Sequence, residues 1–343
     1  MRYISKIIIK KLWGDPDLNI EWSLNPDVNV LAGDNGSGKT TVFDLVAGLI
    51  AGEYSGNIGR KAESVQITFN TGEVISYQNI KDSIKNLEAR AKTDKSIKEF
   101  ISELKKQEGN DYKKINSIQF GKFNFEKLKG EREDLLKSID TISTFDQTLI
   151  KNFNEIQEQV SFLKEVRTQL DLETYELQQK YNGYITNIGN LAAEALFDNT
   201  GTAEAQKEIV KQLKDKQNIF FDMIDDLFKK TNKTINRKST TLSFTKNLKK
   251  EISVQELSSG EKQLLIILLT VLVRENKPCI IFMDEPELSL HTDWQRILID
   301  KIRILNEQVQ LIIATHAPLL IVNGWGGNVQ QMDKIILKPK TTK

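Results

Sequence analysis

A glycine-rich stretch at residues 33–41, with the sequence GDNGSGKTT, has the residue types and the spacing that hold nucleotide phosphates. It fits the pattern G-x-x-x-x-G-K-[ST], in which glycines let backbone N–H groups and the start of the next helix face an anion. Lys39 would reach the β- and γ-phosphates, and the Thr40 hydroxyl would ligate Mg²⁺. A tight turn that binds nothing would not need this lysine. The candidate phosphate-binding residues are Asp34, Asn35, Gly36, Ser37, Gly38, Lys39, Thr40 and Thr41.

Two adjacent carboxylates, Asp284 and Glu285, follow the apolar run Ile280–Met283. A buried strand that ends in such a pair is the Walker B arrangement, in which the first carboxylate orients Mg²⁺ and the second polarises the attacking water. A phosphate loop upstream and a second strand end, Ala314–His316, downstream make the pattern more specific. We therefore expect Asp284 at the metal and Glu285 as a catalytic residue.

A third motif, LSSGEKQ at residues 257–263, precedes the apolar helical segment Leu264–Val273. Serine and glycine at a helix start can bind an anion through backbone N–H groups and the helix dipole. The same residues also fit a Ser-x-x-Glu capping box that simply begins a core helix. The candidate residues of this second anion site are Ser258, Ser259, Gly260 and Glu261.

With these three motifs the sequence resembles the ABC-type ATPase superfamily. LSSGE is similar to the signature LSGGQ of that family, with Ser259 replacing a glycine and Glu261 replacing the glutamine. The resemblance implies ATP and Mg²⁺ as cofactors and a head-to-tail homodimer that sandwiches two ATP molecules. In that dimer Ser258 would contact the γ-phosphate bound to the phosphate loop of the opposite protomer.

The resemblance also assigns the two histidines of the chain. His316, within Ala314–Pro318, matches the switch histidine that senses the γ-phosphate. His291 stands where many members carry Asp, and we interpret it as structural. A metal-binding glutamine is expected as well, and Gln78, Gln119 and Gln147 are all candidates. We rank Gln147 first as a Mg²⁺ ligand.

The elements that position these motifs predict an α/β fold, a P-loop NTPase of the ABC-ATPase type with a mixed-sheet head and a helical, short coiled-coil-like insertion. Strands are expected within residues 3–32, at 64–69 and 73–77, and at the buried runs 279–283 and 311–314. We expect three parts. Residues 1–80 form the first half of the head with Walker A, 81–238 the mainly helical insertion, and 239–343 the second half with the signature, Walker B and the switch histidine.

Within the insertion a heptad pattern runs from Phe153 to Ala195, weakened by Gly183 and Gly189. A second helix, about Glu204–Lys230, would return antiparallel, with one face formed by Ile209, Leu213, Phe220, Ile224 and Leu227. A protruding hairpin and the helices of an ordinary globular lobe fit this pattern equally well.

The composition of the chain restricts the kinds of partner and metal site that it can have. The 343 residues carry a net charge of +1, so nucleic-acid contact would have to be local. Cys279 is the one cysteine and lies in an apolar run, which excludes a disulfide framework and a thiolate metal site and predicts a core residue. The start has no long apolar segment, and Leu264–Val273 is too short to span a bilayer, so we expect a cytoplasmic protein without membrane contact.

One basic cluster has no acidic residue within it and could contact DNA or RNA phosphates. A solvated basic loop fits it at least as well. Its members are Lys229, Lys230, Lys233, Arg237, Lys238, Lys246, Lys249 and Lys250.

The long stretch between Thr40 and Leu257 is unlike the compact ATPase subunits of transporters. A helical insertion there is similar to the SMC-like and OLD-like ATPases that act on DNA. PELSLH together with THAP looks most like the stand-alone ATPases of bacterial defence modules such as Septu, PARIS and certain retrons. This resemblance implies a separately encoded effector, a nuclease or toxin. A DNA-repair or DNA-clamp ATPase is the alternative, and a scaffold that binds ATP without turnover is a third reading, against which Glu285 argues.

Overall fold

The computed structural model describes residues 1–51, 61–79, 102, 117–118, 138–142, 168–197, 203–239 and 241–337. They divide into two compact units, the first formed by Met1–Ile139 with Asn328–Lys343 and the second by Asp140–Gly327. The first unit contains the phosphate loop, and the second contains the signature, Walker B and switch-histidine segments. The predicted three-part division at residues 80 and 238 stays a prediction.

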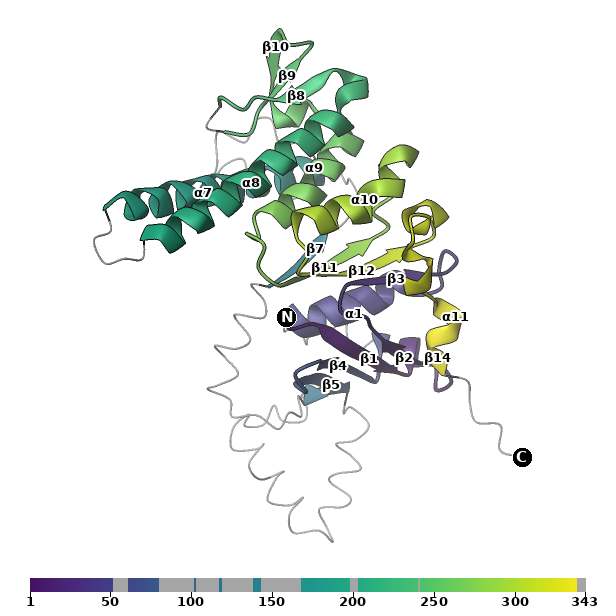
Figure 1. Ribbon diagram of the computed structural model, residues 1–343. Coiled ribbons are helices and arrows are strands. Elements are labelled where there is room, and N and C mark those ends of the chain that lie inside the picture. Colours follow the sequence, from purple (N-terminus) through teal and green to yellow (C-terminus); the bar gives the residue numbers. More distant parts are fainter. Residues whose placement is uncertain are drawn as a thin grey trace. The chain divides into compact units, whose positions relative to one another are not determined.

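The first unit contains a six-stranded sheet in the order β14-β2-β1-β4-β5-β6 (Figure 1). Its strands are β14 (Ile336–Leu337), β2 (Asn19–Ser23), β1 (Ile4–Lys10), β4 (Ser64–Phe69), β5 (Val74–Asn79) and β6 (Ser117–Ile118). Neighbours in this sheet run antiparallel. β1 buries Ile4, Ile7 and Ile9 completely. The predicted strand pair at 64–69 and 73–77 is confirmed, with a turn at Asn70–Gly72 between the strands.

The phosphate loop joins a strand to a helix, as its motif requires. β3 (Val28–Ala32) precedes the loop and pairs in parallel with β13 (Val329–Gln331). α1 (Lys39–Ala51) follows the loop and packs against β4 and β5, with Val42, Leu45 and Leu49 buried. A short 3-10 turn, η1 (Leu12–Gly14), and α11 (Met332–Ile335) complete the described part of this unit.

The second unit is built on two buried parallel strands. β11 (Cys279–Asp284) pairs with β12 (Val309–Thr315) in a register that runs from Cys279 opposite Val309 to Asp284 opposite Ala314. Every residue of β12 is buried. β7 (Ile139–Ile142) lies next to β11. The predicted strands at 279–283 and 311–314 are therefore confirmed, and both end at the same edge of the sheet.

Two helices follow the motifs of this unit. α9 (Ser259–Leu272) begins in the signature, and α10 (Thr292–Leu305) begins after Walker B; the two helices pack together. Short 3-10 turns lie at η4 (Val254–Glu256), η5 (Pro318–Ile321) and η6 (Trp325–Asn328). Cys279 is buried in β11, as predicted, and burial raises the pKa of its thiol to about 12. Among the described residues, no helix has the length and apolar character to cross a bilayer.

The helical part contains α7 (Gln169–Phe197) and α8 (Ala203–Leu227), which lie side by side and both contact α9 (Figure 1). Gly183 and Gly189 lie inside α7 without interrupting it. On α8 the predicted inward position Ile209 is wrong, because Ile209 is 46% exposed while Val210 is buried in its place. The heptad positions from Phe153 to Arg167 lie outside the described residues. The insertion is thus helical here, and its coiled-coil character stays a prediction.

A small antiparallel sheet in the order β10-β9-β8 adjoins the end of α8, through the turn η3 (Lys229–Thr231). Its strands are β8 (Lys233–Ile235), β9 (Phe244–Lys246) and β10 (Lys250–Ile252). Phe244 of β9 packs against Phe228 at 5.7 Å between ring centres, and Phe228 packs against Trp294 of α10 at 5.9 Å. These ring contacts connect the small sheet, which carries part of the basic cluster, to α10 of the second unit.

Candidate nucleotide-binding site

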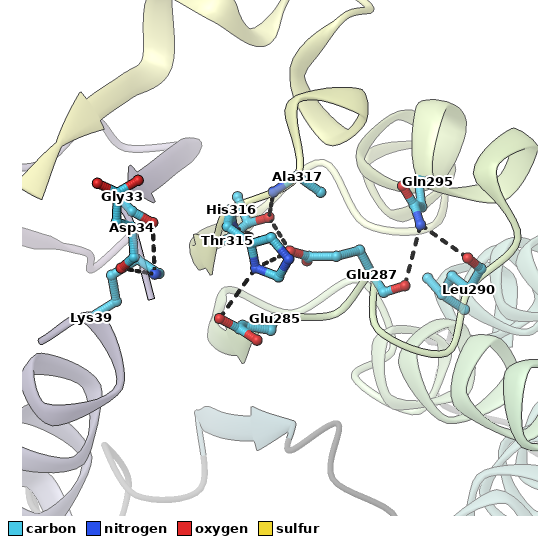
Figure 2. Close-up of polar contacts among 10 residues, drawn as sticks. All are labelled: Gly33, Asp34, Lys39, Glu285, Glu287, Leu290, Gln295, Thr315, His316 and Ala317. Atoms are coloured by element: carbon cyan, nitrogen blue, oxygen red, sulfur yellow. Dashed lines mark hydrogen bonds and ion pairs between the residues drawn. The ribbon is translucent and has the colours of Figure 1, made fainter. Parts of the chain in front are cut away.

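The phosphate loop of the first unit holds its lysine close to the backbone. Lys39 is the first residue of α1, and its Nζ donates to the carbonyl oxygens of Gly33 at 2.8 Å and Asp34 at 3.1 Å (Figure 2). Gly36 and Gly38 have φ angles of +78° and +103°, which favour glycine. The loop therefore curls around the ammonium group, and weak carbonyl partners hold that group where phosphate oxygens can replace them.

Two further features of the phosphate loop, a hydroxyl without a partner in the described part of the chain and closely packed glycines, suit it to an anion. The buried Ser37 Oγ has no hydrogen-bond partner among the described residues. A Cβ on Gly33 would lie 2.9 Å from Ser37 Oγ, and one on Gly38 would lie 2.9 Å from the Trp13 ring, so neither glycine can be replaced without movement. A donor hydroxyl without a partner at the N-terminus of a 13-residue helix suits a phosphate.

The second unit brings the predicted carboxylate and histidine together. β11 ends at Asp284, and Glu285 follows with φ +47° while its N–H donates to the carbonyl of Ala314 at 2.7 Å. His316, directly after β12, places Nδ1 3.3 Å from Glu285 Oε1 (Figure 2). The Glu285 side chain is 16% exposed and the His316 side chain 41% exposed. The two residues thus form a carboxylate–imidazole pair that solvent can reach.

Two of the predicted magnesium ligands, Thr40 and Asp284, offer side-chain oxygen atoms, which are the ligands that Mg²⁺ prefers. Thr40 lies exposed in the first turn of α1, and Asp284 lies half-buried at the end of β11. Mg²⁺ is commonly held by one or two carboxylates together with substrate phosphates. Each residue offers an oxygen of the kind such a site uses, and that the two hold one ion stays a prediction. Gln147 and Gln119 lie outside the described residues, as does the side chain of Gln78, so the glutamine ligand stays a prediction.

The signature loop is held by a capping box. Ser258 is the N-cap of α9, and its Oγ accepts a hydrogen bond from the N–H of Glu261 at 3.4 Å. The Glu261 carboxylate in turn accepts from the N–H of Ser258 at 2.8 Å and from its hydroxyl at 2.9 Å. Ser258 and Ser259 are nevertheless exposed. The helix start is therefore both capped and open to an anion from outside.

Glu261 does not face outward with the serines. It is 1% exposed and accepts from Lys233 Nζ at 2.5 Å and from Thr231 Oγ1 at 2.7 Å. Burial alone would raise the pKa of Glu261, but the hydrogen bonds from Lys233, Ser258 and Thr231 leave it below its ordinary value. The predicted contact of this side chain with nucleotide is thus not supported, because its oxygens already bind donors inside the protein.

The basic cluster is largely neutralised by carboxylates from other parts of the chain. Lys233 is 8% exposed and paired with Glu261, so the prediction that Lys233 is available to nucleic acid is wrong. Three other members are paired: Arg237 with Asp222 and Asp225, Lys230 with Asp293, and Lys250 with Glu256. The four exposed members without an ion pair in the described chain are Lys229, Lys238, Lys246 and Lys249.

Sequence reasoning missed Glu287, which is 5% exposed and accepts from Thr315 Oγ1 at 2.5 Å and from the His316 N–H at 3.2 Å (Figure 2). The available signal was a third acidic residue close to Walker B, two positions after Glu285. His291, by contrast, has the structural role expected for it. It is the N-cap of α10, where its Nδ1 accepts from the N–H of Asp293 at 3.3 Å.

Known proteins resemble this chain in sequence and in fold. The sequence is 24% identical over 355 residues to the Retron Vc95 probable ATPase of Vibrio cholerae serotype O1 biovar El Tor, covering 87% of this chain and 67% of the relative. It is 21% identical over 380 residues to the Retron Ec83 probable ATPase of Escherichia coli, covering 92% and 68%.

Among solved structures, the Smc head bound to the C-winged helix domain of ScpA matches with a TM-score of 0.51 and 13% identity, covering 96% of this chain and 93% of that one. The Smc head with an extended coiled coil, bound to the C-terminal domain of ScpA from Pyrococcus furiosus, matches with a TM-score of 0.50, 14% identity and the same coverage. These likenesses confirm the predicted fold class, the P-loop head of the ABC type.

A family model described as "AAA domain, putative AbiEii toxin, Type IV TA system" matches residues 28–323, which include the phosphate loop, the signature, Walker B and His316. The match spans most of both units. The chain therefore belongs to this AAA-domain family of ABC-type ATPases.

Proposed function

We propose that this chain hydrolyses ATP as a head-to-tail homodimer and thereby controls a separately encoded effector, a nuclease or toxin, in bacterial antiviral defence. The observation that carries hydrolysis is the pair formed by Glu285 Oε1 and His316 Nδ1, 3.3 Å apart at the ends of two parallel strands. A carboxylate held by an imidazole in this way can accept a proton from an attacking water.

Nucleotide binding would use the first unit. Lys39 would leave the carbonyls of Gly33 and Asp34 for the β- and γ-phosphates, and Ser37 Oγ would find its partner there. Thr40 and Asp284 would hold Mg²⁺, which when bound supplies charge neutralisation at the β- and γ-phosphate oxygens. In this proposal the protein itself supplies the loop, the ammonium group and the base.

Dimerisation would use the signature. Ser258 and Ser259 are exposed at the N-terminus of the 14-residue α9, where the helix dipole favours negative charge. In the proposed dimer these serines meet the γ-phosphate of the ATP held by the partner protomer's phosphate loop. ATP would then bridge two chains, so its hydrolysis would separate them.

Control of an effector is suggested by the relatives named as retron ATPases and by the helical pair α7 and α8. A helix pair of this length can present a surface to a second protein. The test is to co-express the chain with the products of its neighbouring genes and to purify it by affinity. The proposal expects a stable assembly whose effector activity changes between wild type and the Glu285→Gln variant, and it expects no nuclease activity from the chain alone. Recovery of this chain alone, or an effector indifferent to that substitution, would contradict it.

A second candidate function, a DNA-clamp ATPase, is favoured by four exposed lysines, Lys229, Lys238, Lys246 and Lys249. Their contact with phosphates would give an affinity that falls steeply as salt rises. The measurement is duplex binding by the purified chain at several salt concentrations, with all four lysines changed to Gln as the comparison. Salt-dependent binding that the substitutions abolish would support the clamp, and binding unaffected by them would exclude it.

A further inference from the structure

His316 has two carboxylates at the same ring nitrogen. Its Nδ1 lies 3.3 Å from Glu285 Oε1 and 3.5 Å from Glu287 Oε1 (Figure 2). An ionised carboxylate oxygen can only accept a hydrogen bond. Nδ1 hydrogen-bonds to Glu285 and lies at ion-pair distance from Glu287, so this nitrogen is stabilised when it carries a proton. The hydrogen bond at one imidazole nitrogen decides the state of the other, so this arrangement leaves Nε2 as the nitrogen free to accept.

Glu287 is held far more firmly than Glu285. Its side chain is 4% exposed, against 16% for Glu285. Its Oε1 accepts from Thr315 Oγ1 at 2.5 Å and from the backbone N–H of His316 at 3.2 Å. Its main-chain carbonyl accepts from the N–H of Leu290 at 3.0 Å and from Gln295 Nε2 at 3.2 Å. Thr315 and the His316 N–H thus hold one oxygen of the carboxylate, and Leu290 and Gln295 hold the main chain of the same residue.

Burying the Glu287 carboxylate costs folding free energy, which indicates that this carboxylate has a role in the site. Its Oε2 is buried and has no hydrogen-bond partner among the described residues. A buried carboxylate is unfavourable unless it is fully paired, and a neutral side chain could accept from Thr315 at lower cost. The described side-chain nitrogen that lies within ion-pair distance of Glu287 is Nδ1 of His316, at 3.5 Å.

We propose that Glu287 is a positioning residue for His316: it keeps the proton of the neutral ring on Nδ1 and leaves Nε2 as a hydrogen-bond acceptor. A phosphate oxygen also only accepts, so contact of Nε2 with the nucleotide, which rests on the proposed function, needs a proton on Nε2 as well, whereas the position of the proton in the neutral ring is a property of the nucleotide-free protein. Glu285 alone cannot serve equally, because it is more exposed and must act at the attacking water in the proposed mechanism.

The proton position can be measured directly, because the chain has two histidines, His291 and His316. In a His291→Asn background, where Asn is also a good N-cap, ¹⁵N-histidine labelling reports on the ring of His316 alone. The spectra are recorded without nucleotide, at a pH where the ring is neutral. The inference expects a pyrrole-type Nδ1 and a pyridine-type Nε2 in the parent. It expects the Glu287→Gln variant to shift toward the tautomer protonated at Nε2.

Two further variants separate positioning from general structural support. Thr315→Val breaks the shortest contact of Glu287 but keeps the carboxylate, so the Nδ1–H tautomer should persist. Glu256→Gln removes an exposed carboxylate from a capping box elsewhere in the unit and should change nothing. The inference is overturned if Glu287→Gln leaves the His316 shifts as in the parent, or if Thr315→Val changes them as much. Neither result bears on ATP hydrolysis, which is measured separately.

Discussion

At the residue scale, Lys39 shows how the loop prepares for phosphate. The residue is 4% exposed, and its ammonium group is hydrogen-bonded to two carbonyls of its own loop. Lys39→Ala should weaken ATP binding roughly 10- to 100-fold, since a hydrogen bond to a charged group contributes about 1.5–3 kcal/mol. Lys61→Ala is the matched control, because Lys61 forms an exposed pair with Asp44 in the same unit. Fluorescence titration with a labelled ATP analogue measures both, and equal affinities would contradict the role of Lys39.

Glu285 is the residue on which turnover should depend. Glu285→Gln keeps the shape of the side chain but removes the base, so ATP should still bind while hydrolysis slows by about 10²- to 10⁴-fold. Glu256→Gln, which changes an exposed carboxylate in the same unit, should retain the parent rate. Steady-state phosphate release measures the difference. An unchanged rate for Glu285→Gln would remove this residue from the mechanism.

At the element scale, the signature helix is fixed by a close approach to the segment after Walker B. A Cβ on Gly260 would lie 2.4 Å from the carbonyl oxygen of Ser289. Gly260→Ala must therefore separate the two segments, and we expect a loss of about 1–3 kcal/mol in unfolding free energy. Gly189→Ala is the control, since nothing lies within 4 Å of a Cβ there and alanine favours a helix. Chemical denaturation that finds both variants equally stable would contradict the packing.

The buried pair of Glu261 with Lys233 should make stability depend on acid. The folded pKa of Glu261 is lowered, so its contribution is present above the ordinary carboxyl pKa of about 4.3 and is lost as pH falls through the lower folded value. Lys233→Met should cost about 3–5 kcal/mol near neutral pH, because it leaves a buried charge unpaired. Lys250→Met, which breaks an exposed pair, should cost less than about 1 kcal/mol. Urea unfolding from pH 7 to pH 3 measures this; similar losses for both variants would refute it.

The sequence predicted correctly those elements that are marked by a short pattern of neighbouring residues. The buried strands β11 and β12, the phosphate loop and the helix α9 follow from apolar runs and from motif spacing. The strands of β8–β10 are three residues long and carry no periodicity, so sequence alone could not reveal them. The burial of Lys233 and Glu287 also escaped prediction, because it depends on partners distant in the chain, Glu261 and Thr315.

At the scale of the whole molecule, the chemistry is divided between two units. The phosphate loop lies in the first, and the signature, Walker B and switch-histidine residues lie in the second. The sequence could predict this list of parts because each motif is short. The head-to-tail dimer and the separately encoded effector stay predictions, since both depend on surfaces of a second molecule.

The central claim, that ATP joins two chains through the signature, is tested most directly by light scattering. In the Glu285→Gln background with ATP and Mg²⁺, the mass should rise from that of the 39.2 kDa chain to twice that value. Adding Ser258→Arg should keep the protein at 39.2 kDa while ATP still binds its own loop, because the arginine occupies the space of the partner's γ-phosphate. A mass that does not respond to bound ATP, or Ser258→Arg chains that dimerise like the parent, would contradict the account.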